Sequence, residues 1–197
     1  MPDADKTIRA AKAELRKEML ARRQQAAAAA PDAGARLKAN LLAAVPSLPA
    51  AAVAAFWPMG DEIDVRPLLL HFHAQGHVCA LPATGRRGET LRFRRWTPDT
   101  ELVPAVFGTR EPPPEAPPVD PDLLLVPLLA FDAAGWRLGY GAGFYDRTLA
   151  DLRARKNVLA VGVAYAAQEA PAVPHDGADQ RLDWIVTERG ATRIAAG

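Results

Sequence analysis

The segment richest in chemical possibilities is the glycine-rich stretch at residues 137–146, which reads Arg-Leu-Gly-Tyr-Gly-Ala-Gly-Phe-Tyr-Asp. Glycine permits positive φ and lets a ligand approach the peptide N–H groups. A helix pattern follows, and a helix N-terminus adds unpaired N–H donors and partial positive charge. The stretch therefore predicts a phosphate-binding loop, with a glycine-rich turn that binds nothing as the alternative. Its G-x-G-x-G spacing matches neither a P-loop nor a dinucleotide fingerprint.

Three charged side chains could complete a phosphate site. Asp146 follows the glycines, where a carboxylate either favours the helix N-terminus or binds Mg²⁺ beside a phosphate. Lys12 and Arg16 are four residues apart in a helix pattern, so they project on one side. They form either a solvated basic face or two cations that reach a nucleotide phosphate.

An acidic turn, residues 59–64, follows the first apolar strand pattern and contains Asp61, Glu62 and Asp64. These carboxylates repel one another unless they are paired or solvated. Asp64 is expected to cap the next helix, whereas Glu62 has no evident structural duty. Glu62 could accept two N–H donors from a heterocyclic substrate. The alternative is an exposed acidic turn.

Nucleophiles and soft metal ligands are scarce in this chain. The single cysteine, Cys79, excludes an internal disulfide and a multi-cysteine metal site. Ser47 is the only serine, and the four histidines lack recognisable ligand spacing. No Ser–His–Asp set can be traced, so we expect no covalent protein nucleophile.

Charge and hydropathy exclude some classes of partner. Lysine and arginine total 24 against 23 acidic residues, which leaves no global basic field for nucleic acid. The longest strongly apolar run, residues 123–131, is too short for a membrane span. Residues 1–23 are charged throughout and do not resemble a secretory signal, so we expect a cytoplasmic protein. Arginines cluster locally and form either a solvated hairpin or a site for an anionic tail or single-stranded nucleic acid: Arg86, Arg87, Arg92, Arg94 and Arg95.

Strand and helix patterns alternate along the chain. We expect helices over residues 6–30, 32–45, 65–75 and 144–156, with Asp32 as a possible cap of the second. We expect strands over residues 52–57, 77–81, 91–96, 122–127, 158–164 and 184–186, and a proline-rich loop over 104–121. This alternation predicts a three-layer α/β/α fold with an open, mostly parallel sheet, and ligands beyond the carboxyl ends of its strands. The length of 197 residues favours a single domain over residues 1–197.

Four segments, in this order, resemble the 5-formyltetrahydrofolate cyclo-ligase family: Lys12 with Arg16, residues 57–64, residues 137–146, and the tail at residues 173–183. The resemblance covers about residues 12–187. It implies an enzyme that uses ATP and Mg²⁺ to convert 5-formyltetrahydrofolate to 5,10-methenyltetrahydrofolate, with release of ADP and phosphate. The implied steps are phosphorylation of the formyl oxygen and ring closure by N10.

The same resemblance implies a role for individual residues. Mg²⁺ would be held by Asp146 and Asp179, and the pterin would be positioned by Trp57 and Glu62, with residues 140–144 also facing the folate. Asp183 matches a family aspartate without an assigned role. The residues implied to bind ATP are Lys12, Arg16, Arg137, Leu138, Gly139, Tyr140, Gly141, Ala142, Gly143, Phe144 and Tyr145, and those implied to face the folate from the glycine segment are Tyr140, Gly141, Ala142, Gly143 and Phe144.

One position departs from the family pattern. Phe144 stands where many members have tyrosine, so no proton transfer can rest there, whereas Tyr145 keeps its hydroxyl. We expect a monomer whose partners are small molecules, without nucleic acid or membrane. The alternatives are a non-catalytic nucleotide- or folate-binding protein, an RNA-binding module that uses the arginine cluster, and a sugar-phosphate isomerase. Consumption of ATP separates the cyclo-ligase from the binding protein and the isomerase, whereas salt-dependent RNA affinity would indicate the RNA-binding module.

Overall fold

A computed structural model describes residues 2–45 and 52–195 of the chain. Pro46 and Pro49, which separate the expected helix over residues 32–45 from the expected strand over 52–57, lie outside these ranges, as does the single serine, Ser47.

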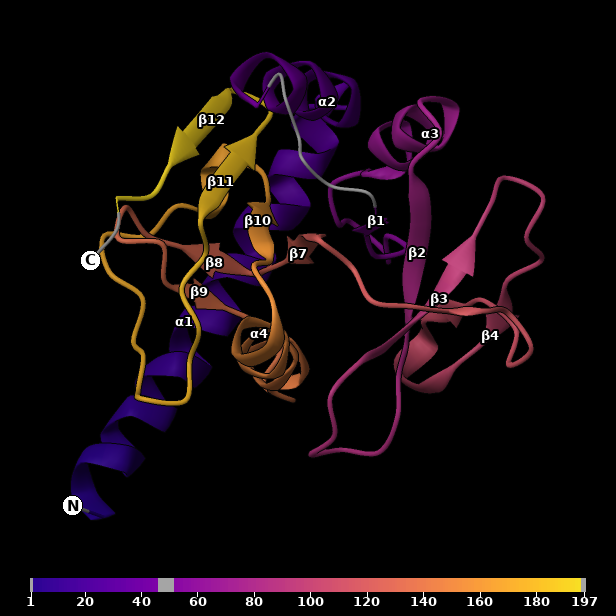
Figure 1. Cartoon of the computed structure of the whole chain (residues 1–197). Coiled ribbons are helices and arrows are strands. Elements are labelled where there is room, and N and C mark those ends of the chain that lie inside the picture. The colour runs from indigo at the N-terminus through magenta and orange to yellow at the C-terminus, as the bar shows by residue number, and fades with distance from the viewer. Residues whose placement is uncertain (1, 46–51, 196–197) are drawn as a thin grey trace.

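The centre of the fold is an eight-stranded sheet in the order β12-β11-β10-β7-β1-β2-β3-β6 (Figure 1). The five inner strands, from β11 to β2, are parallel. At the edges, β12 runs antiparallel to β11, β3 to β2 and β6 to β3. The strands are β1 Ala52–Ala54, β2 Val78–Ala83, β3 Arg92–Trp96, β6 Pro118–Val119, β7 Leu123–Pro127, β10 Leu159–Val163, β11 Trp184–Thr187 and β12 Gly190–Arg193.

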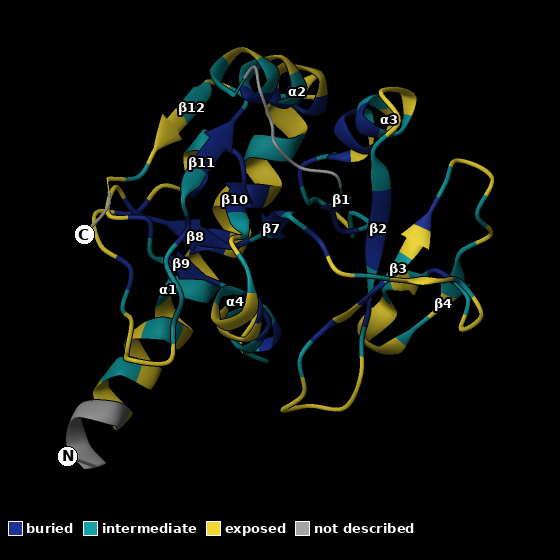
Figure 2. Cartoon of the chain, in the orientation of Figure 1, coloured by how far each residue is buried: buried dark blue, intermediate teal, exposed yellow. Residues whose placement is uncertain are grey.

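Helices cover both faces of this sheet, which gives the three layers that the sequence predicted. Successive side chains of a strand point to opposite faces. Leu123 and Leu125 of β7 accordingly join one apolar cluster, with α2 (Ala33–Ala44) and α3 (Arg66–Ala74). Leu124 and Val126 join the other cluster, with α4 (Phe144–Arg155). The inner strands are buried along most of their length (Figure 2).

The first helix, α1 (Pro2–Ala29), packs against the chain that follows β7. Met19 of α1 is buried in a third apolar cluster, which contains Leu129, Ala130 and Leu138. The last two belong to a short antiparallel hairpin of β8 (Ala130–Phe131) and β9 (Arg137–Leu138). The face of α1 that carries Met19 therefore borders the carboxyl end of β7.

Strand order reverses between β1 and β7, and this reversal decides where a ligand can bind. From β1 the chain moves through α3 to β2 on one side, whereas from β7 it moves through α4 to β10 on the other. The two connections diverge and leave a crevice beyond the carboxyl ends of β1 and β7, the usual ligand site of such sheets. The acidic turn follows β1, and the glycine segment follows β7 by way of the β8–β9 hairpin.

Several predicted boundaries differ from the structure. Strand β1 ends at Ala54 instead of residue 57, and β2 continues through Pro82 to Ala83 instead of ending before the proline. Proline is tolerated there because β1 pairs only as far as Ala80, so Pro82 lies beyond it and pairs with β3 alone. The sequence analysis also missed the β8–β9 hairpin and β12, which are short.

The predicted helix caps also differ in detail. Asp32 occupies the N-cap position of α2 without a capping hydrogen bond, and its carboxylate pairs with Arg36 at 3.0 Å. Asp64 lies one residue before the N-cap of α3, and its Oδ1 accepts the backbone N–H of Arg66 at 2.9 Å. Asp64 thus satisfies a first-turn donor, as expected, from a slightly different position.

The proline-rich segment is largely the predicted loop. It contains two short strands, β4 (Val103–Pro104) and β5 (Arg110–Glu111), a 3₁₀ turn η1 (Val106–Gly108), and β6, which extends the sheet. A second 3₁₀ turn, η2 (Ala166–Gln168), contacts α1. Among the described residues, no helix combines the length and apolar character that a bilayer span requires.

Candidate active site

Glu62 is the buried carboxylate of the turn after β1. Its side chain is only 6% exposed. Its Oε2 accepts the Met59 N–H at 2.9 Å, and its Oε1 accepts the Tyr140 hydroxyl at 2.7 Å. Burial raises the pKa of Glu62, although the two hydrogen bonds and the charge of Arg23 oppose that rise.

The hydrogen bonds to Glu62 leave acceptor capacity on both oxygens. An ionised carboxylate has about four lone-pair sites, two on each oxygen. Among the described residues, one hydrogen bond ends at each oxygen of Glu62, and Arg23 Nη1 lies 3.8 Å from Oε1, beyond hydrogen-bond distance. One acceptor site per oxygen is left, which suits a flat heterocycle that presents two N–H donors side by side.

Arg23 is a site residue that the sequence analysis missed. Its side chain is 6% exposed, and it donates through Nη1 to the Tyr140 hydroxyl and through Nη2 to Asp61 Oδ1 at 2.6 Å. The helical spacing of the basic residues could have indicated Arg23 as part of the site. At 100° per residue, Lys12, Arg16 and Arg23 lie within about 40° on one face of α1.

The glycine segment turns tightly beside α1. Arg16 Nε donates to the Gly139 carbonyl at 2.9 Å. Gly141 has φ +97°, and a Cβ at that position would lie 3.3 Å from the Arg16 guanidinium. Gly143, with φ +68°, is the N-cap of α4, and Arg147 donates to the Ala142 carbonyl at 2.6 Å. Two of the glycines are therefore required by the backbone itself.

Arg137 and Asp146 form an ion pair at the start of α4. Arg137 Nη2 lies 2.7 Å from Asp146 Oδ1, and the Arg137 side chain is 3% exposed. The same carboxylate oxygen accepts the Gln180 N–H at 3.1 Å, and Arg137 donates to the Gln180 carbonyl. The tail that contains Asp179 is thereby fixed against the glycine segment.

Lys12 pairs with this tail instead of projecting freely. Its Nζ lies 2.7 Å from Asp179 Oδ2 and 3.3 Å from Asp176 Oδ2. Burial lowers the pKa of Lys12, but the hydrogen bonds and charges of Asp179 and Asp176 outweigh it and raise that pKa overall. The structure thus brings together the predicted basic residues, the glycine segment and the predicted metal carboxylates.

Aromatic residues lie just before the acidic turn and within the glycine segment. Trp57 is half-buried, with the Arg66 guanidinium 5.7 Å from its ring centroid. Phe144 is buried, and the exposed ring of Phe107 meets it edge-on at 6.4 Å. Burial raises the pKa of Tyr145, and the charge of Glu62 adds to that rise. Leu138 is buried in β9, so only its backbone could face a ligand.

The carboxylates of Asp146 and Asp179 are the candidate ligands for Mg²⁺. Within residues 2–45 and 52–195, no group of three or more His, Cys, Asp or Glu side chains has an arrangement that could hold a metal. The hydrogen bonds to Asp146 end at Oδ1 and those to Asp179 end at Oδ2. Each carboxylate thus offers its other oxygen, and Mg²⁺ commonly uses one or two carboxylates plus phosphate oxygens. The donor set fits.

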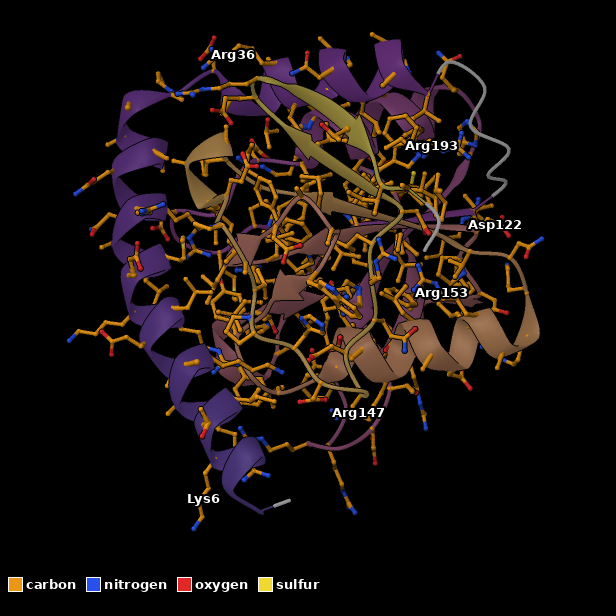
Figure 3. The ribbon with its side chains drawn as sticks, turned by 90° about the vertical axis from the view of Figure 1, so that its left-hand side faces the viewer. Lys6, Arg36, Asp122, Arg147, Arg153 and Arg193 are labelled. Atoms are coloured by element: carbon orange, nitrogen blue, oxygen red, sulfur yellow. The ribbon has the colours of Figure 1, made fainter. Side chains whose placement is uncertain are left out.

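Asp183 has a structural task. Its Oδ2 accepts the Ala160 N–H at 2.7 Å and Arg153 Nη2 at 3.0 Å. Figure 3 shows Arg153 and Arg147 on α4, the helix that this contact ties to the end of the tail. Asp183 therefore fastens the start of β11 to β10 and α4.

The arginine cluster does not converge on one point. Arg94 is half-buried and pairs with Glu111 at 3.2 Å, and it also donates to the Pro112 carbonyl. The other four members, Arg86, Arg87, Arg92 and Arg95, are exposed. Arg94 thus fastens the proline-rich segment to β3.

An open, mostly parallel sheet with a glycine-rich segment and a buried carboxylate at its switch point defines an α/β enzyme that binds small molecules. Residues 8–188 match the 5-formyltetrahydrofolate cyclo-ligase family. The chain belongs to this family, which comprises ligases of folate one-carbon metabolism.

Relatives of known name agree with this assignment. The chain is 41% identical over 133 residues to the 5-formyltetrahydrofolate cyclo-ligase of Mycolicibacterium smegmatis, covering 63% of this chain and 68% of that one. It is 33% identical over 159 residues to that of Escherichia coli K12, covering 78% and 87%. The NMR structure of Aquifex aeolicus 5,10-methenyltetrahydrofolate synthetase superimposes with a TM-score of 0.73 at 33% identity and covers 94% of both chains.

Proposed function

We propose that this chain converts 5-formyltetrahydrofolate to 5,10-methenyltetrahydrofolate with ATP and Mg²⁺, and releases ADP and phosphate. The observation that carries the proposal is the 2.7 Å contact between Tyr140 and Glu62. It joins the glycine segment, whose geometry suits phosphates, to a buried carboxylate whose open acceptor sites suit the N–H groups of a pterin. Both substrates would then meet in one hydrogen-bonded site.

At the folate end, Glu62 would accept two pterin N–H groups and so fix the orientation of the ring. Trp57 lies between β1 and the acidic turn, and its half-buried ring would offer the pterin an apolar face. Phe144, with the neighbouring Phe107, would contact the part of the folate that extends over the glycine segment, since aromatic faces suit the aminobenzoyl ring. These contacts bring N5 and N10 toward the nucleotide.

At the nucleotide end, the backbone N–H groups of residues 139–143 and the start of α4 would bind phosphate oxygens. Lys12 and Arg137 are paired with Asp179 and Asp146 in this structure. When the nucleotide binds, Lys12 and Arg137 would exchange these carboxylate partners for phosphate oxygens. Asp146 and Asp179 would hold Mg²⁺, which supplies charge neutralisation when bound.

The reaction balances without a protein nucleophile. The formyl oxygen attacks the γ-phosphorus, and the bond to ADP breaks. The N10 lone pair then attacks the activated formyl carbon, N10 loses its proton, and the carbon–oxygen bond breaks with departure of phosphate. Phosphoryl transfer requires mainly positioning and charge neutralisation. The chain supplies both through Arg16, Lys12 and the glycine segment.

The test is incubation with 5-formyltetrahydrofolate, ATP and Mg²⁺ while methenyl absorbance and ADP are followed together. We expect one ADP per methenyl product and no product when either ATP or Mg²⁺ is omitted. With ¹⁸O in the formyl group, the label should appear in inorganic phosphate. Folded protein that binds folate without consuming ATP would instead support a binding protein, and turnover of a sugar phosphate without ATP would support an isomerase. The monomeric state and cytoplasmic location stay predictions.

A further inference from the structure

Arg23 is a buried arginine to which the reaction described above gives no task. It contacts two segments that are distant from it in the sequence, the acidic turn and the glycine segment. From α1 it donates to Asp61 Oδ1 at 2.6 Å, donates to the Tyr140 hydroxyl, and lies 3.8 Å from Glu62 Oε1. Its guanidinium carbon also lies 5.6 Å from the centroid of the Tyr140 ring. Removing a charged guanidinium from water costs free energy, and proteins bury such a charge only where it is paired and hydrogen-bonded.

The chain of hydrogen bonds has a fixed direction. An arginine can only donate, so the Tyr140 oxygen accepts from Arg23. The single hydroxyl proton of Tyr140 must then point to Glu62 Oε1, which accepts it at 2.7 Å. Tyr140 is 48% exposed, so packing alone does not hold its ring. Arg23 thereby sets both where the Tyr140 hydroxyl lies and which way its proton points.

We propose that Arg23 is a positioning residue for the folate substrate: acting through Tyr140, it holds the Glu62 carboxylate in the orientation that accepts the pterin N–H groups. The inference rests on the proposed function, since it assigns a task within the same site. Asp61 serves as the counter-ion that keeps the Arg23 guanidinium in place. Arg23 itself does not touch the substrate.

The charges around Glu62 also support a task for Arg23 in the site. The charged and titratable groups that face Glu62 are Arg23 from α1, Asp61 from its own turn, Tyr140 from the glycine segment and Tyr145 from α4. Burial raises the pKa of Glu62 and Asp61 raises it further, whereas Arg23 lowers it. Without Arg23 the carboxyl would take up a proton at higher pH. A protonated carboxyl has lost one of the two acceptors that the pterin requires.

The experiment compares Arg23→Met and Arg23→Lys with Arg22→Met as the matched control. Arg22 is the neighbouring residue, with a side chain that is 46% exposed and paired with Glu18 on the helix surface. Affinity for 5-formyltetrahydrofolate is measured without nucleotide by quenching of tryptophan fluorescence. The pH profile of kcat/KM is measured separately for the folate and for ATP.

We expect Arg23→Met to weaken folate affinity roughly 10–100-fold, the range for a lost charge-assisted hydrogen bond. KM for ATP should change little, and the acidic limb of the folate profile should move to higher pH. Arg23→Lys should return the acidic limb toward its original position because it restores the charge, with only part of the affinity. Arg22→Met should match the unmodified protein.

Equal folate affinity and equal pH profiles for Arg23→Met and Arg22→Met would overturn the inference. So would a loss of thermal stability with equal losses for folate and ATP, which marks a purely structural residue. If Arg23→Met does not fold, Tyr140→Phe decides, because it removes the same link while the Arg23–Asp61 pair stays. Tyr140→Phe must then weaken folate affinity. Absence of methenyl product from the unmodified protein would refute the proposed function instead, and the binding assay would still report on Arg23.

Discussion

Replacement of Asp146 tests the metal site and the fold at once, and the structure shows how to separate them. The sequence alone suggests that Asp146→Ala would strongly reduce Mg²⁺-dependent turnover and leave the fold intact. In the structure, however, Asp146 is the partner of Arg137, whose side chain is 3% exposed. Alanine would leave that guanidinium buried without its carboxylate. We therefore expect Asp146→Ala to lose stability as well as activity.

The size of the stability loss follows from the contact. At 2.7 Å, with an effective dielectric constant near 20, the pair attracts by about 6 kcal/mol, which is an upper bound. The Asp146 side chain is 24% exposed, and Arg137 keeps its bond to the Gln180 carbonyl. Breaking such a pair from one side costs about 2–4 kcal/mol. For a chain of this size, about 3 kcal/mol lowers Tm by roughly 6–12 °C.

Asp146→Asn isolates the metal contribution. Its amide oxygen still accepts from Arg137, so the stability loss should be about 1–2 kcal/mol. The negative charge that Mg²⁺ requires is gone, so kcat/KM should fall on the order of tenfold or more and should recover only at higher Mg²⁺. Asp151→Ala, on an exposed position of α4 paired with Arg155, is the matched control. It should change stability by less than about 0.5 kcal/mol and leave turnover unchanged.

Thermal unfolding and a Mg²⁺ titration of turnover together decide the outcome. The reasoning about the ion pair fails if Asp146→Ala unfolds at the same temperature as the unmodified protein. The reasoning about the metal fails if Asp146→Asn shows the same Mg²⁺ dependence and the same kcat/KM.

Three further outcomes are expected. Gly141→Ala should lower the free energy of unfolding by about 1–3 kcal/mol because φ at this position is +97°. Gly139→Ala has open space around its Cβ position, so it should keep Tm and weaken nucleotide binding in a titration. Equal Tm values for the two variants would contradict this. Asp183→Ala should lower Tm, because it leaves the Ala160 N–H without its hydrogen-bond acceptor. A change in kcat/KM without a change in Tm would count against the structural role. Burial raises the pKa of the Cys79 thiol to about 11, so a thiol reagent at neutral pH should label only unfolded protein. The stabilisation from the buried neutral thiol should be present at neutral pH and lost as the pH rises toward that value. Rapid labelling of native protein would refute this.

Local patterns were enough to locate most elements of the chain. Strand β7, for example, reads as a continuous apolar run because both of its faces are covered, which is typical of parallel sheets. Helix α4 begins at the glycines, as expected from the backbone freedom of glycine at a helix start. Boundaries were less well predicted where a neighbouring strand decides them, as at Pro82.

The chemical types in the site could also be predicted from the sequence. The glycine segment, Glu62 and Asp146 attract attention because their residue types suit phosphates, N–H donors and metal ions. Arg23 did not, because an arginine on a helix surface is ordinary until its surroundings are known. The helical spacing from Lys12 and Arg16 was the only signal that could have singled it out.

The sequence by itself determined the three-layer α/β fold, the segments that carry the chemistry and the type of group that each presents. The tertiary structure decided which groups meet. Lys12 pairs with Asp179 across 167 residues, and Tyr140 reaches Glu62 across 78. Helix and strand preferences act over a few residues, whereas these contacts depend on the strand order that reverses between β1 and β7. That reversal brings the acidic turn and the glycine segment to one crevice, and no local pattern specifies it.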